Sequence, residues 1–74
     1  MVSSMRSVEI RLNGEVRHVP ATLTLSGLLE HLSVNPERVA VEFNREIVKR
    51  SDWSSTEVHQ GAEVEIVEFV GGGR

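Results

Sequence analysis

The sequence predicts a small α+β domain in which a mixed β-sheet packs against one central helix. The chain has 74 residues, which is room for a single domain. Segments near both ends alternate apolar and polar residues, a pattern typical of half-buried strands. Between them runs one stripe of leucines with helical spacing. A single amphipathic helix must bury its stripe against a sheet, so these observations together favour the α+β architecture.

The first two elements form a predicted β-hairpin. Residues 8–12 alternate apolar and polar side chains, and residues 15–19 form the returning strand. Asn13-Gly14 between them is a strong hairpin signal, because both central positions of a type I′ turn need a positive φ. Pro20 lacks a backbone N–H and ends the second strand. On the core face of the first strand we expect Val8, Ile10 and Leu12.

The next segment changes to helical periodicity. Its stripe follows the spacing i, i+3, i+4, i+7 and consists of Leu25, Leu28, Leu29 and Leu32. Thr24 is the expected N-cap, because its hydroxyl can accept a hydrogen bond from a free backbone N–H. Gly27 weakens the helix by up to about 1 kcal/mol relative to alanine, so this cost is tolerated or a neighbouring backbone passes close by. Asn35-Pro36 ends the region, since a residue before proline avoids helical angles.

The second half of the chain carries the remaining strands. Residues 38–43 form a third strand, and a turn at residues 44–46 leads to a short strand at residues 47–48. A turn at residues 60–61 precedes the last strand, over residues 63–70. On the core face of the third strand we expect Val39, Val41 and Phe43.

Ser51-Asp52-Trp53 indicates a cap followed by one helical turn, with Trp53 packing as a plug. The complete order is ββ-α-ββ-β, which is the β-grasp, or ubiquitin-like, architecture. In it the first and last strands lie together at the sheet centre. We therefore expect a β-grasp domain over residues 1–70 and a flexible C-terminal glycine tail over residues 71–74.

The tail is the expected reactive part of the chain. Gly71, Gly72 and Gly73 have no side chains to pack in a strand and lose the most entropy on ordering. Without a Cβ, this backbone can enter a channel too narrow for other residues. Its reactive group is a terminal carboxylate, which must be activated before it can be attacked. The sequence has no GxxxxGK[ST] phosphate loop and no cysteine nucleophile, so a partner enzyme is expected to activate it.

Several segments, taken in order, resemble the ThiS family of thiamine-biosynthesis sulfur carriers. The resemblance covers about residues 8–73. Gly-Gly endings are common, so the ordered set of segments is what makes it specific. The set comprises residues 12–15 (LNGE), 24–29 (TLSGLL), 36–42 (PERVAVE), 44–48 (NREIV) and 65–73 (EIVEFVGGG).

The resemblance implies that the chain is a recycled cosubstrate and not an enzyme. In the family, an E1-like adenylyltransferase uses Mg-ATP to adenylate the C-terminal glycine. Sulfur taken from cysteine through a desulfurase then replaces AMP, and a thiazole synthase accepts it from the resulting thiocarboxylate. Carried over to this chain, Gly73 is the thiocarboxylate and adenylation site, with Gly72 beside it in the channel. The carrier itself is expected to bind no cofactor.

Arg74 departs from the family pattern, in which chains usually end on glycine. Its long charged side chain should not fit a glycine-width channel. Three explanations stay open: a processing peptidase removes Arg74 and exposes Gly73, Arg74 is an added residue, or the protein is no carrier in this form.

Val67 and Phe69 are candidate docking residues for the activating enzyme, with Glu65 and Glu68 as flanking acidic contacts. Exposed apolar patches mark partner sites. The alternative is that Val67 and Phe69 pack under a loop or against a second layer, and the sequence does not separate these two interpretations.

Three other functions compete with the leading hypothesis. One is a molybdopterin-synthase small-subunit type of carrier, which would co-purify with that synthase. Another is a modifier that forms isopeptide bonds, which would give conjugate ladders dependent on Gly73. The third is a β-grasp interaction module with an inert tail, which would gain no sulfur.

Composition narrows the class of partner. The net charge is −3, with 11 acidic and 8 basic residues, which argues against a nucleic-acid surface. No apolar run approaches the roughly 20 residues that span a bilayer, and no export signal is evident, so we expect a cytoplasmic protein without membrane contact. The three histidines lie far apart in unrelated elements, so no metal site is expected; they are His18, His31 and His59.

Overall fold

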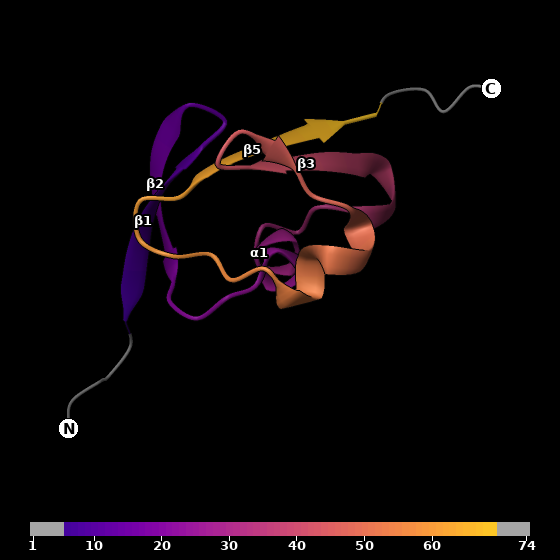
Figure 1. The fold of residues 1–74 in the computed structure, drawn as a ribbon. Helices are drawn as coiled ribbons and strands as arrows, with labels where there is room; N and C mark the ends of the chain where they lie inside the picture. The colour runs from indigo at the N-terminus through magenta and orange to yellow at the C-terminus, as the bar shows by residue number, and fades with distance from the viewer. Residues whose placement is uncertain (1–5, 70–74) are drawn as a thin grey trace.

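The computed structural model describes residues 6–69. Its sheet has the strand order β2-β1-β5-β3-β4, in which β1 and β5 are parallel and the other neighbours antiparallel. The first and last strands are therefore adjacent inside a mixed sheet, as predicted, and α1 lies beneath it (Figure 1). This confirms the β-grasp fold. The elements are β1 (Ser7–Leu12), β2 (Glu15–Pro20), α1 (Leu25–His31), the 3₁₀ helix η1 (Pro36–Arg38), β3 (Val39–Phe43), β4 (Glu46–Ile47), the 3₁₀ helix η2 (Arg50–Ser55) and β5 (Glu63–Glu68).

Tight hairpins connect two of the antiparallel pairs of the described sheet, β1 with β2 and β3 with β4. Asn13 and Gly14 have φ values of 49° and 84°, the positive pair that a type I′ turn needs. Asn44 and Arg45 repeat this geometry between β3 and β4, with φ values of 51° and 72°. The second turn therefore has two residues and no glycine. The prediction of a turn over 44–46 was one residue too long, because Glu46 already pairs in β4.

Helix α1 begins where the sequence predicted. The Thr24 hydroxyl accepts a hydrogen bond from the Gly27 N–H at 3.2 Å. The helix ends at His31, and Leu32 is its C-cap. A Cβ built on Gly27 would lie 3.2 Å from Leu23 Cδ2, so a side chain, and no neighbouring backbone, passes close to this position.

Trp53 is 4% exposed, and its indole N–H donates to the Val48 carbonyl at 2.9 Å, which confirms its packing role. The predicted cap was wrong. Lys49 occupies the N-cap of η2 and makes no side-chain cap bond. The third strand also begins one residue later than predicted, because Arg38 ends η1.

The segment between η2 and β5 packs against the core, and the sequence predicted only its turn at residues 60–61. Backbone bonds join Leu25 N–H to Thr56 O at 2.9 Å and Val58 N–H to Leu23 O at 2.8 Å. Val58 and Ala62 are consequently 2% and 0% exposed. The buried core comprises Ile10, Leu12, Val19, Leu25, Leu28, Leu29, Val39, Val41, Trp53, Val58, Ala62 and Val64.

Candidate docking face and C-terminal strand

Strand β5 leads the chain from the middle of the sheet towards the predicted tail. It ends at Glu68, so Phe69, which was predicted within the strand, lies just outside it. The Phe69 N–H still donates to the Arg38 carbonyl at 2.7 Å, so pairing with the β3 side continues past the strand. The rest of the predicted last strand and the proposed reactive residues lie outside the described part; they are Val70, Gly71, Gly72, Gly73 and Arg74. The geometry available for the site is therefore that of β5 and its neighbours.

No helix formed by residues 6–69 covers one face of the sheet, and the side chains on this face can be placed from the strand register. Glu65 pairs with Glu42, and Glu42 pairs with Ile47, so these three form a row across β5, β3 and β4. Val67 pairs with Ala40 in the next row. We call Ile47, Ala40, Val67 and Phe69 the helix-free patch. Because paired residues point to the same side of a sheet, Ile47, Ala40 and Val67 lie opposite the buried Val64 and Val41. Phe69 joins the patch by alternation, two residues after Val67, and its backbone bond to Arg38 continues the pairing.

The apolar members of the patch are open to solvent within the described structure. Ile47 is 78% exposed, Val67 58% and Phe69 54%. Val67 and Phe69 therefore do not pack under a loop or a second layer formed by residues 6–69, and that alternative was wrong for this part of the chain. Val16 is also 52% exposed and lies on the same face, but at the far edge, in β2 opposite Arg11.

The acidic residues of the site divide between the two faces. Glu65 shares the helix-free face with Val67, whereas Glu68 alternates to the other face with Ile66. Glu68 there lines a shallow hollow of about 280 Å³ together with Leu12, Asn13, Arg17, Leu32, Val34 and Ile66. A larger hollow of about 530 Å³ lies on the helix side and contains no predicted site residue; its lining includes Leu29, Val34, Pro36, Arg50 and Trp53. The four predicted docking residues are thus not one cluster.

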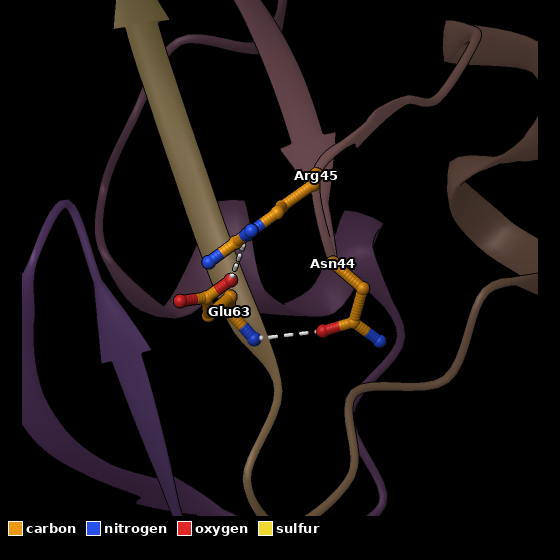
Figure 2. A network of polar contacts seen from close by, with 3 residues as sticks. All are labelled: Asn44, Arg45 and Glu63. Carbon is orange, nitrogen blue, oxygen red and sulfur yellow. Dashed lines mark hydrogen bonds and ion pairs between the residues drawn. The ribbon is translucent and has the colours of Figure 1, made fainter.

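The helix-free face has an unbalanced acidic row. Glu42 and Glu65 are exposed, direct cross-strand partners, and like charges in that position repel each other. Between residues 6 and 69 no ion pair neutralises either carboxylate. Glu63 differs, because Arg45 Nε lies 3.2 Å from its carboxylate (Figure 2). The patch therefore presents apolar side chains beside two unpaired negative charges.

The histidines lie in separate places. His18 lies 3.7 Å from Glu9 across the first hairpin, and His59 packs edge-on against Phe43 with ring centroids 5.5 Å apart. No three His, Cys, Asp or Glu side chains gather as metal ligands within the described range. None of the helices placed by the structure is both long and apolar enough to cross a membrane.

The ThiS family model matches residues 10–73. The chain belongs to the ThiS family. This match begins within β1, covers every later element of the described β-grasp and extends through the three glycines. Family membership supports a role as a sulfur carrier in thiamine biosynthesis, and it confirms the resemblance found in the sequence.

Two solved structures agree with this assignment. The crystal structure of thiamine biosynthesis protein ThiS from Geobacter metallireducens has a TM-score of 0.79 and 35% identity, and the match covers 89% of this chain and 100% of that one. The solution structure of a thiamine biosynthesis protein from the same organism has a TM-score of 0.76 and 34% identity, with 90% of each chain covered.

Relatives of different length share the same segment. A thiazole synthase of Paramagnetospirillum magneticum is 42% identical over 66 residues, which are 89% of this ThiS chain and 20% of the synthase. A thiazole synthase of Magnetococcus marinus is 40% identical over 67 residues, 90% of this chain and 21% of the synthase. This chain thus spans about a fifth of these relatives. The uncharacterized protein ycf40 of Porphyra purpurea is 35% identical, with 92% of this chain and 96% of that protein covered.

Sequence reasoning missed two exposed apolar residues of this face, Ile47 and Val16. A signal for both was present. Val16 and Val19 differ by an odd number of positions in one strand, so they cannot share the core face. Ile47 and Val48 are adjacent, so one of them also had to face outward. Which of the two faces solvent depends on the register with β3, which only the structure shows.

Proposed function

We propose that this ThiS chain carries sulfur as a thiocarboxylate on Gly73. The observation that supports this most directly is the extent of the family match, which includes Gly71, Gly72 and Gly73 and stops before Arg74. On this proposal a peptidase removes Arg74 and leaves Gly73 as the terminal residue. The protein acts as a cosubstrate in the cytoplasm, and other proteins supply the catalytic groups.

The chemistry proceeds in two steps on a partner enzyme. The Gly73 carboxylate attacks the α-phosphorus of Mg-bound ATP, pyrophosphate leaves, and an acyl-adenylate forms. The sulfur leaves cysteine as a persulfide on a desulfurase, and a reducing thiol releases it as hydrosulfide while a disulfide forms. The hydrosulfide then attacks the acyl carbon. A C–S bond replaces the C–O bond, and AMP leaves. Adenylation is needed because AMP is a far better leaving group than the carboxylate oxygen itself.

The helix-free patch is the proposed docking surface for the E1-like adenylyltransferase. Val67 and Phe69 supply apolar contact close to the tail, and Ile47 extends it across the sheet. Glu42 and Glu65 add two negative charges that have no neutralising partner in the described part of the chain. A partner with an apolar surface and adjacent arginine or lysine side chains would relieve this repulsion.

The proposed acceptor of the sulfur is a thiazole synthase. This rests on the two relatives named thiazole synthase, in which a segment similar to this chain makes up about a fifth of the protein. The same finding favours a thiazole synthase over a molybdopterin synthase as partner. Co-purification with one or the other separates these acceptors.

The test compares two forms of the protein, one ending at Gly73 and one retaining Arg74. Each is incubated with the cognate adenylyltransferase, Mg-ATP and a sulfur source, and its intact mass is measured. The form ending at Gly73 is expected to gain the mass difference between sulfur and oxygen, and the form with Arg74 is expected to stay unchanged. If the shorter form gains no mass although the cognate enzyme is demonstrably active, the proposal is wrong.

A further inference from the structure

Asn13 makes three hydrogen bonds to the C-terminal strand. Its backbone N–H donates to the Val64 carbonyl at 2.9 Å. Its side-chain Oδ1 accepts the Ile66 N–H at 2.8 Å, and its Nδ2 donates to the Ile66 carbonyl at 3.3 Å. A turn residue of the first hairpin thus satisfies both backbone groups of a residue more than fifty positions away.

The side chain of Asn13 extends the hydrogen-bond ladder between β1 and β5 beyond the last paired residue of β1. The parallel register of β1 with β5 ends at Leu12 and Val64, and after Gly14 the chain turns into β2. The Asn13 amide has the donor and the acceptor of a peptide group, so it takes the place of the next residue of β1. From Ile66 onward, pairing on the opposite side of β5 is with β3 and Arg38.

The turn alone does not explain why asparagine is needed here. The φ of Asn13 is 49°, and glycine adopts this angle without a steric cost. Asparagine therefore contributes its two side-chain bonds in addition to the turn. These bonds reach β5 next to Val67 of the helix-free patch and close to the point where the chain continues towards Gly73.

We propose that Asn13 is a positioning residue for the C-terminal tail. It holds β5 at Ile66 so that, while the helix-free patch is docked, the chain leaves the sheet in the direction of the partner's active site. This inference rests on the proposed carrier function. Losing the two bonds leaves β5 held from one side near its end, which widens the range of directions in which β5 can point at Glu68 and Phe69.

Asn44 provides a matched control. It occupies the same position of the second two-residue turn, with a φ of 51°. Its Oδ1 accepts the Glu63 N–H at 2.9 Å (Figure 2). Its backbone N–H donates to the Glu63 carbonyl at 2.7 Å. Asn44 therefore binds the first residue of β5, at the end of the strand that is farther from the tail. Asn44→Gly and Asn13→Gly each keep the turn and remove the side-chain bonds.

The first measurement is amide hydrogen exchange of the two variants. In Asn13→Gly the Ile66 amide is expected to exchange about ten-fold faster, because it loses its acceptor. The Phe69 amide keeps its bond to Arg38 and should change little. In Asn44→Gly the Glu63 amide should exchange faster, and the exchange rate of the Ile66 amide should stay unchanged. Unaltered exchange at Ile66 in Asn13→Gly overturns the inference.

The second measurement is steady-state adenylation of chains ending at Gly73. Asn13→Gly is expected to lower kcat about three- to ten-fold, the range of one or two hydrogen bonds, with KM changed less than about two-fold. Asn44→Gly should keep kcat within about two-fold of wild type. Asn13→Asp retains the acceptor for the Ile66 N–H and loses the donor, so it should fall between wild type and Asn13→Gly.

The outcomes distinguish this inference from the proposed function. A wild-type chain that is never adenylated overturns the carrier function and the role of Asn13 with it. A wild-type chain that is converted, while Asn13→Gly keeps its full kcat or falls only as far as Asn44→Gly, overturns the positioning role alone. A low kcat in Asn13→Gly, with intermediate activity in Asn13→Asp, supports both.

Discussion

The two faces of β5 differ sharply although they belong to one strand. Val64 is 0% exposed beneath the sheet, whereas Val67, three residues later, is 58% exposed on the helix-free face. The same residue type is thus used once for the core and once for the surface. Because side chains alternate along a strand, one segment can supply stability on one side and a docking surface on the other.

Because buried and exposed side chains lie on different faces of the sheet, substitutions on the two faces should differ in their effect on stability. The helix-covered face contains the whole buried cluster, and a chain of this size has a total stability of only about 4–11 kcal/mol. The exposed side chains of the helix-free face contribute little burial, and backbone hydrogen bonds hold its strands together. Substitutions on the two faces should therefore affect different measurements, unfolding for one and partner binding for the other.

The largest expected effect is that of Leu28→Ala. Leu28 is 0% exposed in the middle of the helix stripe, and such truncations cost about 2–5 kcal/mol through lost burial and the cavity left behind. Urea unfolding should show this loss as a lower midpoint. Ile47→Ala removes similar apolar volume from a side chain that is 78% exposed and should stay within about 0.5 kcal/mol of wild type. Equal losses would contradict the division between the faces.

A closer version of the same test stays within β5. Val64→Ala should lower the free energy of unfolding by about 2 kcal/mol, because a fully buried valine loses its packing. Val67→Ala makes the identical chemical change on the other face and should lie within about 0.5 kcal/mol of wild type. Thermal or urea unfolding of the pair measures the difference directly. A loss for Val67→Ala as large as that for Val64→Ala would mean that the helix-free face also carries core packing.

Much of the fold was predictable because its signals are local. The Asn13-Gly14 turn, the Thr24 cap and the leucine stripe each follow from the chemistry of a few neighbouring residues. The predictions that failed concerned features that depend on contacts with residues distant in the sequence. The second turn is tight because Asn44 and Arg45 adopt positive φ without glycine, and Ala62 is buried because the segment before β5 closes the core.

The candidate site was predictable to a smaller extent. Val67, Phe69 and Glu65 were expected near the partner, and alternation along β5 puts Val67 and Glu65 on one face. Ile47 joins them only through the register of β4 with β3, which pairs it with Glu42. The contact of Asn13 with Ile66 joins residues more than fifty positions apart, and no local pattern signals it. The tail residues stay a prediction, because they lie beyond Phe69.

A negative charge placed within the helix-free patch tests whether this patch binds the adenylyltransferase. Val67→Asp is expected to weaken binding of the E1-like enzyme about ten-fold, equivalent to about 1.4 kcal/mol, because it adds a third negative charge and removes apolar contact. Val16→Asp is the matched control, since Val16 is 52% exposed on the same face but at the opposite edge. Calorimetric titration of both variants measures the affinities. Equally weakened binding by both variants would mean that the enzyme does not bind specifically at the helix-free patch.

The smallest expected effect is that of the ion pair between Arg45 and Glu63. Its atoms are 3.2 Å apart, yet the arginine side chain is 85% exposed and the glutamate 43%. Solvent and salt screen such a pair, so a double-mutant cycle of Arg45→Ala and Glu63→Ala should give a coupling of about 0–1 kcal/mol. The coupling should shrink further in high salt.

Asn44→Gly provides a comparison for the Arg45–Glu63 ion pair, because it removes an uncharged hydrogen bond to Glu63. The bond from Glu63 N–H to Asn44 Oδ1 holds the backbone of β5, and this N–H keeps no side-chain acceptor once it is lost. Its loss should lower the free energy of unfolding by about 1 kcal/mol, and salt should barely change it. A salt-sensitive coupling between Arg45 and Glu63 larger than the Asn44 effect would show that side-chain charge, and not backbone pairing, holds the helix-free face together at the start of β5.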